Sequence, residues 1–396
     1  MMMFITIYQS RHTYRTVIFV LCDINNYNYI HFHMVICGTD LVSSILPYVH
    51  ILSSSSSSTY CSQCLNSAND LKRCSKCHRT SYCSISCQRK DWIYHKHECS
   101  HLHTINDEYD LTRLFLRLII RYKQDHGIEN TSTKRSISDL TTHENEIYND
   151  KQRYKTFQLV YQYLKSWGFF ENIDEKLIFE LFCRLIINTL TIHDTIDLKS
   201  IGYGLYLDAT IYNHSCIPTC HTIFNGIYLS IRTISDQLNN EWTINYIDLL
   251  ELYENRQQCL RSNYYFTCQC KRCLENDQHE LILLDKIHHE EQQMDKFINK
   301  NDFFDAYQSS KNLCDCYSKI LPYYHAYVSL HQVKHLKLEL FLADTMSDII
   351  IQSTMKNTCE RVKISMGENH PLTRETINLC EHYQLEMALK NRQITA

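Results

Sequence analysis

Long apolar runs, an excess of positive charge and a secretory signal are all missing from this sequence of 396 residues. No stretch approaches the roughly 20 apolar residues that a membrane-spanning helix needs, so we expect no membrane segment. The formal net charge of −4 and the pI near 6.6 argue against a protein held on DNA by bulk electrostatics. Without a secretory signal, the 20 cysteines are expected to be thiols rather than a disulfide framework. This length predicts two or three domains.

What the sequence has in abundance is cysteine and histidine at metal-ligand spacing. Two intervening residues let one tight turn present both sulfurs to one ion, and three place both ligands on one face of a short helix. Four such pairs supply two tetrahedral sites, which predicts a two-zinc module that is unfolded without metal. The pairs are Cys61-x2-Cys64, Cys74-x2-Cys77, Cys83-x3-Cys87 and His95-x3-Cys99.

A second cysteine cluster, Cys268-x-Cys270-x2-Cys273, supplies three thiolates within six residues. One zinc ion takes four ligands, so a fourth must come from elsewhere in the chain. Cys216 is the best candidate, because it lies in the β-rich segment just upstream. The alternative is a fortuitous cluster without metal.

The spacing of apolar residues divides the chain into segments with different predicted secondary structure. Residues 1–52 show almost no helical periodicity, and the short apolar run at 17–22 is interpreted as a strand at most. Ser53–Ser58 is expected to be a flexible joint. Apolar periodicity predicts helices at 108–122, 146–166 and 174–190, and helical hairpins from about 277 to the end. Strands are predicted at 17–22, 221–224, 227–232 and 242–246, with a hairpin turn at Asn225-Gly226.

A polar pair stands among the apolar strand residues, Asn213-His214. If buried, both side chains need hydrogen-bond partners, which a polar ligand or a satisfied core network would provide. Nearby Tyr246 and the aromatic run Tyr264–Phe266 favour a ligand site. Methyl transfer from a sulfonium to a lysine amine needs aromatic walls, a positioned hydroxyl and little water.

These motifs together resemble the SET- and MYND-domain lysine methyltransferases. The zinc module is similar to the MYND finger, including Tyr82-Cys83-Ser84, and the second cluster is similar to the post-SET zinc motif. The SET motifs are Gly202–Tyr206, Asn213–Cys216, Phe224–Gly226 and Tyr246–Leu249, and Gly367–Pro371 is similar to a turn in the C-terminal domain.

The fold that this resemblance implies is α+β. It comprises a divergent N-terminal part of the SET lobe at 1–52, a MYND-type zinc finger at 61–99 and a β-rich SET domain with a helical insert at 100–250. A cysteine-rich post-SET zinc region at 251–275 and an all-α, TPR-like helical domain at 277–396 complete it.

The resemblance also implies residue roles in S-adenosylmethionine-dependent methylation of protein lysine. Tyr246 and Tyr264 would line the lysine channel, and the cofactor would be held by Asn188, Asn213, His214, Tyr246, Phe266 and His143. Three zinc ions are implied. The finger's cross-brace would give one ion to Cys61, Cys64, Cys83 and Cys87 and another to Cys74, Cys77, His95 and Cys99, and the third would be held by Cys216, Cys268, Cys270 and Cys273.

The N-terminal segment departs from the family pattern, because it lacks glycine. The family begins with a Gly-x-Gly turn that lets the backbone approach the cofactor's carboxylate, where any side chain would collide. This chain has no glycine before Gly38, and the family pattern resumes near Gly38–Leu41 and Pro47–Val49. We therefore expect a replaced or divergent first strand. Ile217 stands where the family usually has an acidic residue.

Two functions follow as hypotheses. The first is an active lysine methyltransferase acting on histone or non-histone proteins. The second is a zinc-dependent adaptor that docks proline-rich partners through the finger. We expect a monomer found in cytoplasm and nucleus, with a finger that unfolds without disturbing the SET core. The basic face of the finger is interpreted as a solvated rim in preference to a nucleic-acid site; it comprises Lys72, Arg73, Lys76, Arg79, Arg89 and Lys90.

Overall fold

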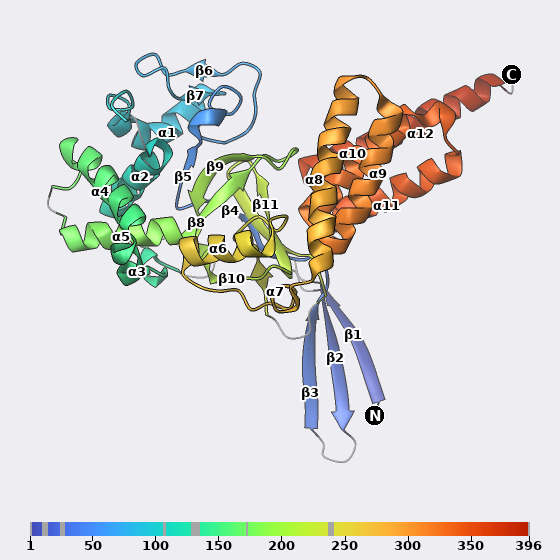
Figure 1. Ribbon diagram of the computed structural model, residues 1–396, viewed down its shortest axis with the longest axis horizontal. Helices are drawn as coiled ribbons and strands as arrows, with labels where there is room; N and C mark the ends of the chain where they lie inside the picture. Colours follow the sequence, from blue (N-terminus) through green and yellow to red (C-terminus); the bar gives the residue numbers. More distant parts are fainter. Residues whose placement is uncertain are drawn as a thin grey trace.

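The computed structural model describes residues 2–9, 15–23, 28–105, 108–127, 135–171, 173–236 and 241–394. Small sheets lie at the centre, α2–α5 lie on one side below the zinc-finger segment, and α8–α12 form a helical body on the other side (Figure 1). The predicted α+β class is therefore confirmed. Within the described residues, no helix is both long and apolar enough to cross a bilayer.

Three N-terminal strands form a sheet of their own. They pair antiparallel in the order β1-β2-β3 and project away from the rest of the molecule (Figure 1). The strand predicted at 17–22 lies within β2, so that prediction is confirmed. The strands are β1 (Met2–Gln9), β2 (Arg15–Asp23) and β3 (Asn28–Val35).

Two three-stranded sheets form the central β region, in the orders β11-β12-β4 and β5-β9-β8. The predicted hairpin joins β11 to β12, and Gly226 turns it with a φ of +59°. A Cβ there would lie 2.5 Å from the Cys64 carbonyl oxygen, so glycine also lets the hairpin approach the finger. The strands are β4 (Asp40–Ile45), β5 (Val49–Leu52), β8 (Thr189–His193), β9 (Ser200–Leu205), β11 (Cys220–Asn225) and β12 (Tyr228–Thr233).

Shorter elements complete the β region. The strand predicted at 242–246 covers only two residues, which pair in parallel with the Asn213-His214 strand. The strands are β6 (Lys72–Arg73), β7 (Ser81–Tyr82), β10 (Asn213–His214) and β13 (Thr243–Ile244). Short 3-10 helices are Ser54–Ser56, Ile137–Asp139, Leu207–Ile211 and Ala343–Thr345.

Five helices lie within the finger or beside the central sheets. The helix predicted at 146–166 is in fact two, because the Asp150 side chain accepts hydrogen bonds from the backbone N–H groups of Gln152 and Arg153 and starts a new helix. The helix predicted to reach residue 190 ends at Asn188, where β8 begins. The helices are α1 (Ile85–Glu98), α2 (Tyr109–Asp125), α3 (Glu144–Asn149), α4 (Lys151–Ser166) and α5 (Glu175–Asn188).

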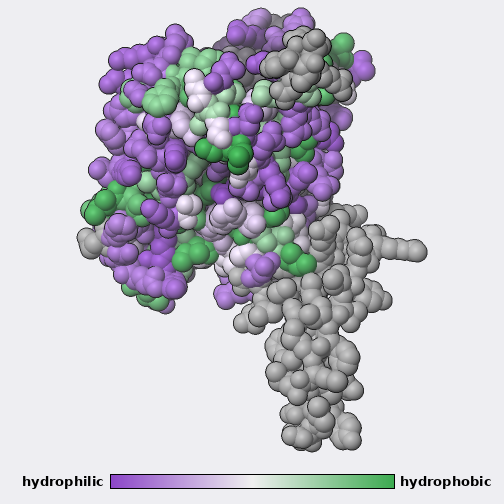
Figure 2. All heavy atoms as spheres, turned by 90° about the vertical axis from the view of Figure 1, so that its right-hand side faces the viewer, coloured by the Kyte–Doolittle hydropathy of each residue, from purple (hydrophilic) through white to green (hydrophobic). Residues whose placement is uncertain are grey.

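From residue 253 onward the described chain is helical. Each helix from α8 to α11 packs against the next, which confirms the predicted helical hairpins. Hydrophilic side chains cover most of this body's outer face, with hydrophobic ones scattered among them (Figure 2). The helices are α6 (Tyr253–Tyr264), α7 (Lys271–Glu275), α8 (Gln278–Asn299), α9 (Phe303–Ile320), α10 (Ala326–Phe341), α11 (Asp348–Met366) and α12 (Pro371–Ile394).

Side chains of the central sheet join it to the helical body. The Arg232 Nε donates to the Ile364 carbonyl over 2.7 Å. The buried His221 ring donates from Nε2 to the Ser365 carbonyl (2.9 Å) and accepts from the Ala326 backbone N–H at Nδ1 (3.1 Å). Both ring nitrogens are therefore used, which fixes His221 in its neutral form.

Candidate functional site

The finger segment brings together its first and third ligand pairs. The Cys64 and Cys83 sulfurs are 3.7 Å apart, and those of Cys83 and Cys87 are 3.6 Å apart. A tetrahedral zinc ion with bonds of about 2.3 Å separates its sulfurs by about 3.8 Å, so these spacings fit zinc. The full set is Cys61, Cys64, Cys83 and Cys87.

The second and fourth pairs form another set, and all four of its residues are buried. The Cys74 and Cys99 sulfurs are 3.7 Å apart, and the Cys77 sulfur lies 3.5 Å from His95 Nε2. The set is Cys74, Cys77, His95 and Cys99. The two sets are those that the resemblance implied for a cross-brace.

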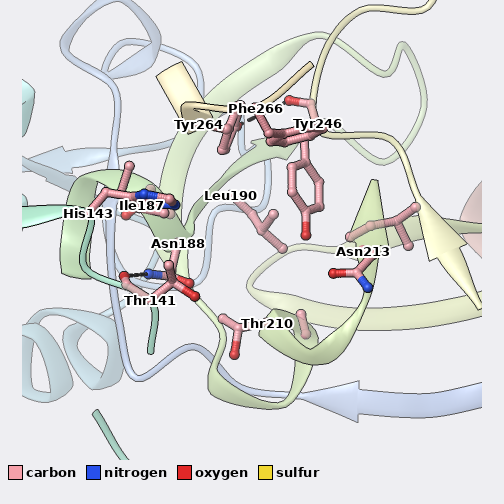
Figure 3. Close-up of a pocket in the computed structure, with 13 residues that line it drawn as sticks. Thr141, His143, Ile187, Asn188, Leu190, Thr210, Asn213, Tyr246, Tyr264 and Phe266 are labelled. Carbon is pink, nitrogen blue, oxygen red and sulfur yellow. Dashed lines mark hydrogen bonds between the residues drawn. The ribbon is translucent and has the colours of Figure 1, made fainter. Parts of the chain in front are cut away.

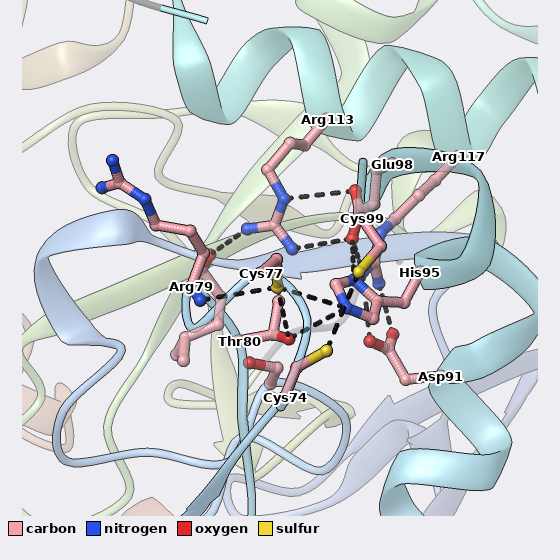
Figure 4. Close-up of polar contacts among 12 residues, drawn as sticks. Cys74, Cys77, Arg79, Thr80, Asp91, His95, Glu98, Cys99, Arg113 and Arg117 are labelled. Carbon is pink, nitrogen blue, oxygen red and sulfur yellow. Dashed lines mark hydrogen bonds and ion pairs between the residues drawn. The ribbon is translucent and has the colours of Figure 1, made fainter. Parts of the chain in front are cut away.

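Behind the second set lies a buried ion network that ties the finger to α2 (Figure 4). His95 Nδ1 lies 3.3 Å from Glu98 Oε1, and Glu98 is bonded in turn by Arg113 (3.1 Å) and Arg117 (2.8 Å). Burial alone would raise the pKa of Glu98, but the charges of Arg113 and Arg117 outweigh it and hold that pKa well below its usual range. Arg117 also pairs with the buried Asp91 over 2.8 Å.

This network has the form of an outer shell around a metal ligand. A carboxylate on the second ring nitrogen fixes the tautomer that leaves Nε2 free to bind metal. Asp91, His95 and Glu98 lie close enough to hold an ion themselves. Since arginines pair with both carboxylates, we interpret them as support for the finger rather than as a further metal site.

The third cysteine set joins the loop after β10 to the segment before α8. The Cys216 sulfur lies 3.5 Å from that of Cys273 and 4.0 Å from that of Cys268. Gln257 on α6 holds Cys268 in place, since its side chain exchanges two hydrogen bonds with the Cys268 backbone. The set consists of the three closely spaced cysteines and the candidate fourth ligand: Cys216, Cys268, Cys270 and Cys273.

A cavity lies between the end of α5, the turn before β10 and the segment after α6 (Figure 3). It brings together six of the residues that the sequence singled out: His143, Asn188, Asn213, Tyr246, Tyr264 and Phe266. The other lining residues are Thr141, Ile187, Thr189, Leu190, Ala209, Thr210 and Ile244. These seven gave no sequence signal, because only the packing of distant segments places them here.

The two asparagine side chains that line this cavity differ in their hydrogen bonds and exposure. Asn188 Nδ2 donates to the carbonyls of Thr141 (2.9 Å) and Arg184 (2.8 Å), which fixes the side chain at the cavity wall. Asn213 is exposed, so the condition of burial considered for the Asn213-His214 pair does not hold for its amide. It occupies a two-residue strand at the cavity edge, where its side chain faces open space rather than core. His143 also lines the cavity, with its ring 5.4 Å from that of Tyr265.

Aromatic side chains form the opposite wall. The Tyr246 ring points into the cavity between Leu190 and Asn213 (Figure 3), and its hydroxyl donates to the Tyr212 carbonyl over 2.5 Å. The ring of Tyr264 lies 5.0 Å from it. Burial raises the pKa of Tyr246 and, with smaller contributions from Cys259 and Tyr246, that of Tyr264, each to about 12. Both phenols are therefore neutral near pH 7.

His214 stands behind this wall rather than in the cavity lining. Its Nδ1 accepts a hydrogen bond from the Tyr246 backbone N–H over 3.0 Å. Its Nε2 lies 3.3 Å from the Cys216 sulfur. The ring therefore connects Tyr246 to the third cysteine set, and burial lowers its pKa to about 4.

A second cavity lies on the far side of the aromatic wall, towards the helical body. It is lined by Leu321, His325 and Tyr327 from that body, together with Asp248. Four residues line both cavities: Thr189, Leu190, Tyr246 and Tyr264. The two cavities thus share one wall, and two of the residues that form it are tyrosines.

The first glycine of the chain lies away from both cavities. Gly38 precedes β4 with a φ of +84°, and a Cβ there would lie 3.3 Å from Ile364 on α11. It therefore serves the contact with the helical body. Among the described residues, Thr141 is the first along the chain that lines the first cavity, so the expectation of a divergent first strand stays a prediction.

Comparisons with known proteins point to one family. The MYND finger family model matches residues 61–99. The chain is 33% identical over 243 residues to histone-lysine N-methyltransferase SMYD3 of Homo sapiens, covering 58% of this chain and 55% of that protein. It is 29% identical over 247 residues to N-lysine methyltransferase SMYD2-A of Danio rerio (61% and 56%) and to human SMYD2 (60% and 56%).

The matched region thus spans little more than half the length of these relatives. The cysteine sets and the α+β architecture are those that the resemblance implied. This chain therefore carries a MYND finger and is similar, over little more than half of its length, to the SMYD lysine methyltransferases.

Proposed function

We propose that this chain is a protein-lysine N-methyltransferase that uses S-adenosylmethionine. The observation that carries the proposal is the pair of cavities separated by a wall of Tyr246 and Tyr264. Methyl transfer from a small cofactor to a lysine of a protein suits this arrangement, with cofactor on one side, peptide on the other and a narrow contact between them. The names of the relatives support the same reaction.

The first cavity suits the cofactor in its donors and its aromatic surface. Phe266 offers a face for stacking against adenine, and the amides of Asn188 and Asn213 offer polar contacts. His214 is assigned a supporting role, because its ring holds the Tyr246 backbone. His143 is assigned to the cavity rim. When bound, S-adenosylmethionine supplies an electrophilic methyl group on a sulfonium.

The chain's own residues position the amine and exclude water. Tyr246 and Tyr264 present aromatic faces that stabilise positive charge near the reacting centre. The hydrogen bond from the Tyr246 hydroxyl to the Tyr212 carbonyl fixes the phenol oxygen as an acceptor aimed into the cavity. Because both tyrosines are neutral near pH 7, they orient the lysine amine and do not remove its proton.

The second cavity is assigned to the protein substrate. Its walls combine apolar surface with Asp248 at an exposed position, which suits a lysine-containing segment. We propose histone or non-histone proteins in the nucleus and cytoplasm as substrates, methylated by the monomer. The exposed Ile85, Trp92 and Ile93 on α1 support docking of proline-rich partners on the finger.

Titration of S-adenosylmethionine into the full chain, followed by transfer of a radiolabelled methyl group to lysine-containing proteins, tests the proposal. We expect saturable binding and label on lysine, and both should weaken in Phe266→Ala. Replacing residues 1–37 with a strand that carries a Gly-x-Gly turn should tighten binding, since each hydrogen bond to a charged group contributes about 1.5–3 kcal/mol.

The second candidate is a zinc-dependent adaptor without methyl transfer. It is favoured by one observation, that no glycine turn lines the cofactor cavity among the described residues. If neither the chain nor the grafted version binds S-adenosylmethionine, while the finger still binds proline-rich peptides, the adaptor function replaces the enzyme.

A further inference from the structure

Two cysteines outside the three zinc sets face each other in the helical body. Cys359 lies on α11 and Cys380 on α12, and their sulfurs are 3.4 Å apart. Cys359 is half-buried and reachable from solvent, whereas Cys380 is buried with 6% of its surface exposed. The pair belongs to a cluster with Leu336, Ile351 and Met355, far along the chain from every zinc ligand.

A metal does not explain this pair. Within the described residues, no group of three or more metal-ligating side chains includes either cysteine. Two thiolates alone leave a zinc ion with half of its four protein ligands. Hydrophobic packing alone accounts for two thiols in a core, but it does not require that they meet sulfur to sulfur.

The contact is close to what a disulfide needs. A sulfur–sulfur bond is about 2.05 Å long, so the two sulfurs must approach by roughly 1.4 Å. α11 and α12 already pack against each other, and rotation of the two side chains can supply such a movement. Both residues lie within regular helix, so no loop has to be reorganised.

The accessible thiol is also the more reactive one. The hydrogen bond between the two sulfurs lowers the pKa of Cys359 to about 7; burial opposes this shift and the charge of Lys363 assists it. The pKa of Cys380 is raised, first by the same partner and then by burial. A substantial share of Cys359 is therefore thiolate near neutral pH, and the thiolate is the form that attacks an oxidant.

We propose that Cys359 and Cys380 are a redox modification site that closes a reversible disulfide between α11 and α12. With glutathione disulfide as oxidant, the Cys359 thiolate attacks one sulfur and releases one glutathione thiolate. Cys380 then loses its proton, attacks the Cys359 sulfur and releases the second glutathione. Two protein thiols lose two electrons and two protons in total, and one glutathione disulfide becomes two glutathione molecules.

The bond would join the helix that carries the SET contacts to the last helix. α11 supplies the carbonyls of Ile364 and Ser365 that bind Arg232 and His221. Cys359 lies less than two turns before these carbonyls on the same helix. Oxidation is therefore expected to hold the docking face of α11 more firmly in place.

Peptide mapping of the zinc-loaded full chain tests the site. After incubation with excess glutathione disulfide and alkylation of the remaining thiols, trypsin should yield residues 357–361 linked to residues 375–390, with a mass two hydrogens below the sum. Oxidised protein should also melt a few degrees higher than reduced protein, because the bond limits the unfolded chain. Addition of dithiothreitol should reverse both changes.

Two variants separate this proposal from general thiol oxidation. Cys359→Ala should abolish the linked peptide and the melting shift without a large loss of fold, since this side chain is half-buried. Cys314→Ala, on the neighbouring helix α9 and also half-buried, should leave both unchanged. Recovery of unmodified thiols, of glutathione retained on Cys359, or of links from Cys359 to other cysteines would overturn the proposal.

Discussion

At the scale of single residues, a substitution of Tyr246 tests the proposed reaction most directly. Tyr246→Phe keeps the ring and removes the hydroxyl that donates to the Tyr212 carbonyl. Losing one oriented group in such a site costs about 2.7–4 kcal/mol of transition-state stabilisation, or roughly a hundred- to thousand-fold in rate. We expect kcat to fall by that factor while cofactor affinity holds, measured against the exposed Tyr228→Phe. Equal rates in both variants would remove Tyr246 from the mechanism.

Arg256 is a second residue with a specific consequence. Its side chain is fully buried, and within the part of the chain that the structure describes its Nε and Nη2 atoms have no hydrogen-bond partner. Burial alone would lower its pKa, but Glu280, together with the charges of Cys216 and Cys273, outweighs that effect and raises it. Four thiolates around one zinc ion carry a net charge of about −2. We infer that Arg256 offsets part of this charge.

Arg256→Gln is therefore expected to weaken the third zinc site. Removing an outer-shell partner typically costs ten- to a hundred-fold in metal affinity. Chelator competition should release one zinc of three faster than from the native chain, whereas Arg261→Gln, exposed on the same helix, should behave like the native chain. Release curves that overlap for the two variants would contradict the inference.

The residue scale also shows where sequence reasoning was limited. Cysteine spacing was enough to group Cys268, Cys270 and Cys273, since short spacings restrict geometry to a few turns. Cys216 was proposed instead from its place in the β-rich segment upstream, and it lies with the other three. The environment of Asn213 was not predictable, because exposure depends on whether a cavity or a core lies beside the strand. Thr141 and Thr210 gave no signal at all, since their backbone and side chains reach the cavity only through packing of α3, α5 and the turn before β10.

Among secondary-structure elements, α1 and α2 are coupled more closely than the sequence suggested. Arg113 and Arg117 on α2 bind Glu98 on α1 and also donate to the carbonyls of Leu52 and His50 at β5. The finger was expected to unfold by itself. The buried network gives a different expectation, because losing the finger would leave two buried arginines without their carboxylates.

Two ligand variants distinguish these expectations. Cys74→Ser disrupts the set that contains His95, and we expect it to lower the stability of the whole SET core by at least about 3 kcal/mol. Cys64→Ser disrupts the other set, whose ligands do not contact the arginines, and should affect the core less. Calorimetry of both variants gives the answer. A main transition unchanged in Cys74→Ser would support the independent finger.

For the molecule as a whole, buried neutral histidines make the joint between sheet and helical body sensitive to acid. Burial, with His325 contributing, lowers the pKa of His221 to about 3, and burial lowers those of His325 to about 4 and His331 to about 3. Unfolded histidine titrates near 6.5, so below that pH the unfolded state binds more protons. The contribution of these histidines to stability is therefore constant above about pH 6.5 and falls as the pH drops towards 4.

Urea unfolding between pH 7.5 and 5 measures this effect. Each such histidine adds up to about 1.4 kcal/mol per pH unit to the slope. His221→Gln can keep a donor and an acceptor for Ser365 and Ala326 without titrating, so it should flatten the slope by about one proton. Zinc content must be followed in parallel, because acid also releases metal. If the free energy of unfolding of the native chain did not change below pH 6.5, these histidines would not be the cause of acid sensitivity.

The overall architecture could be predicted only in part from the sequence. Motif similarity predicted the fold class, and helical periodicity predicted the hairpins from α8 onward. The separate sheet of β1, β2 and β3 was not predicted, because the tract offered β-type composition without a pairing pattern. The docking of α11 on β12 rests on single side chains such as Arg232, which no local pattern marks.

The order β11-β12-β4 has a consequence during protein synthesis. Asp40 on β4 pairs with Arg232 on β12, 192 residues further along the chain. At about 5–20 residues per second, the ribosome delivers β12 roughly 10–40 s after β4. The finger, with all its ligands between residues 61 and 99, can bind zinc and fold within that interval. The newly made β4 meanwhile waits as an unpaired edge, so the nascent chain is expected to need chaperone protection until its partner strand emerges.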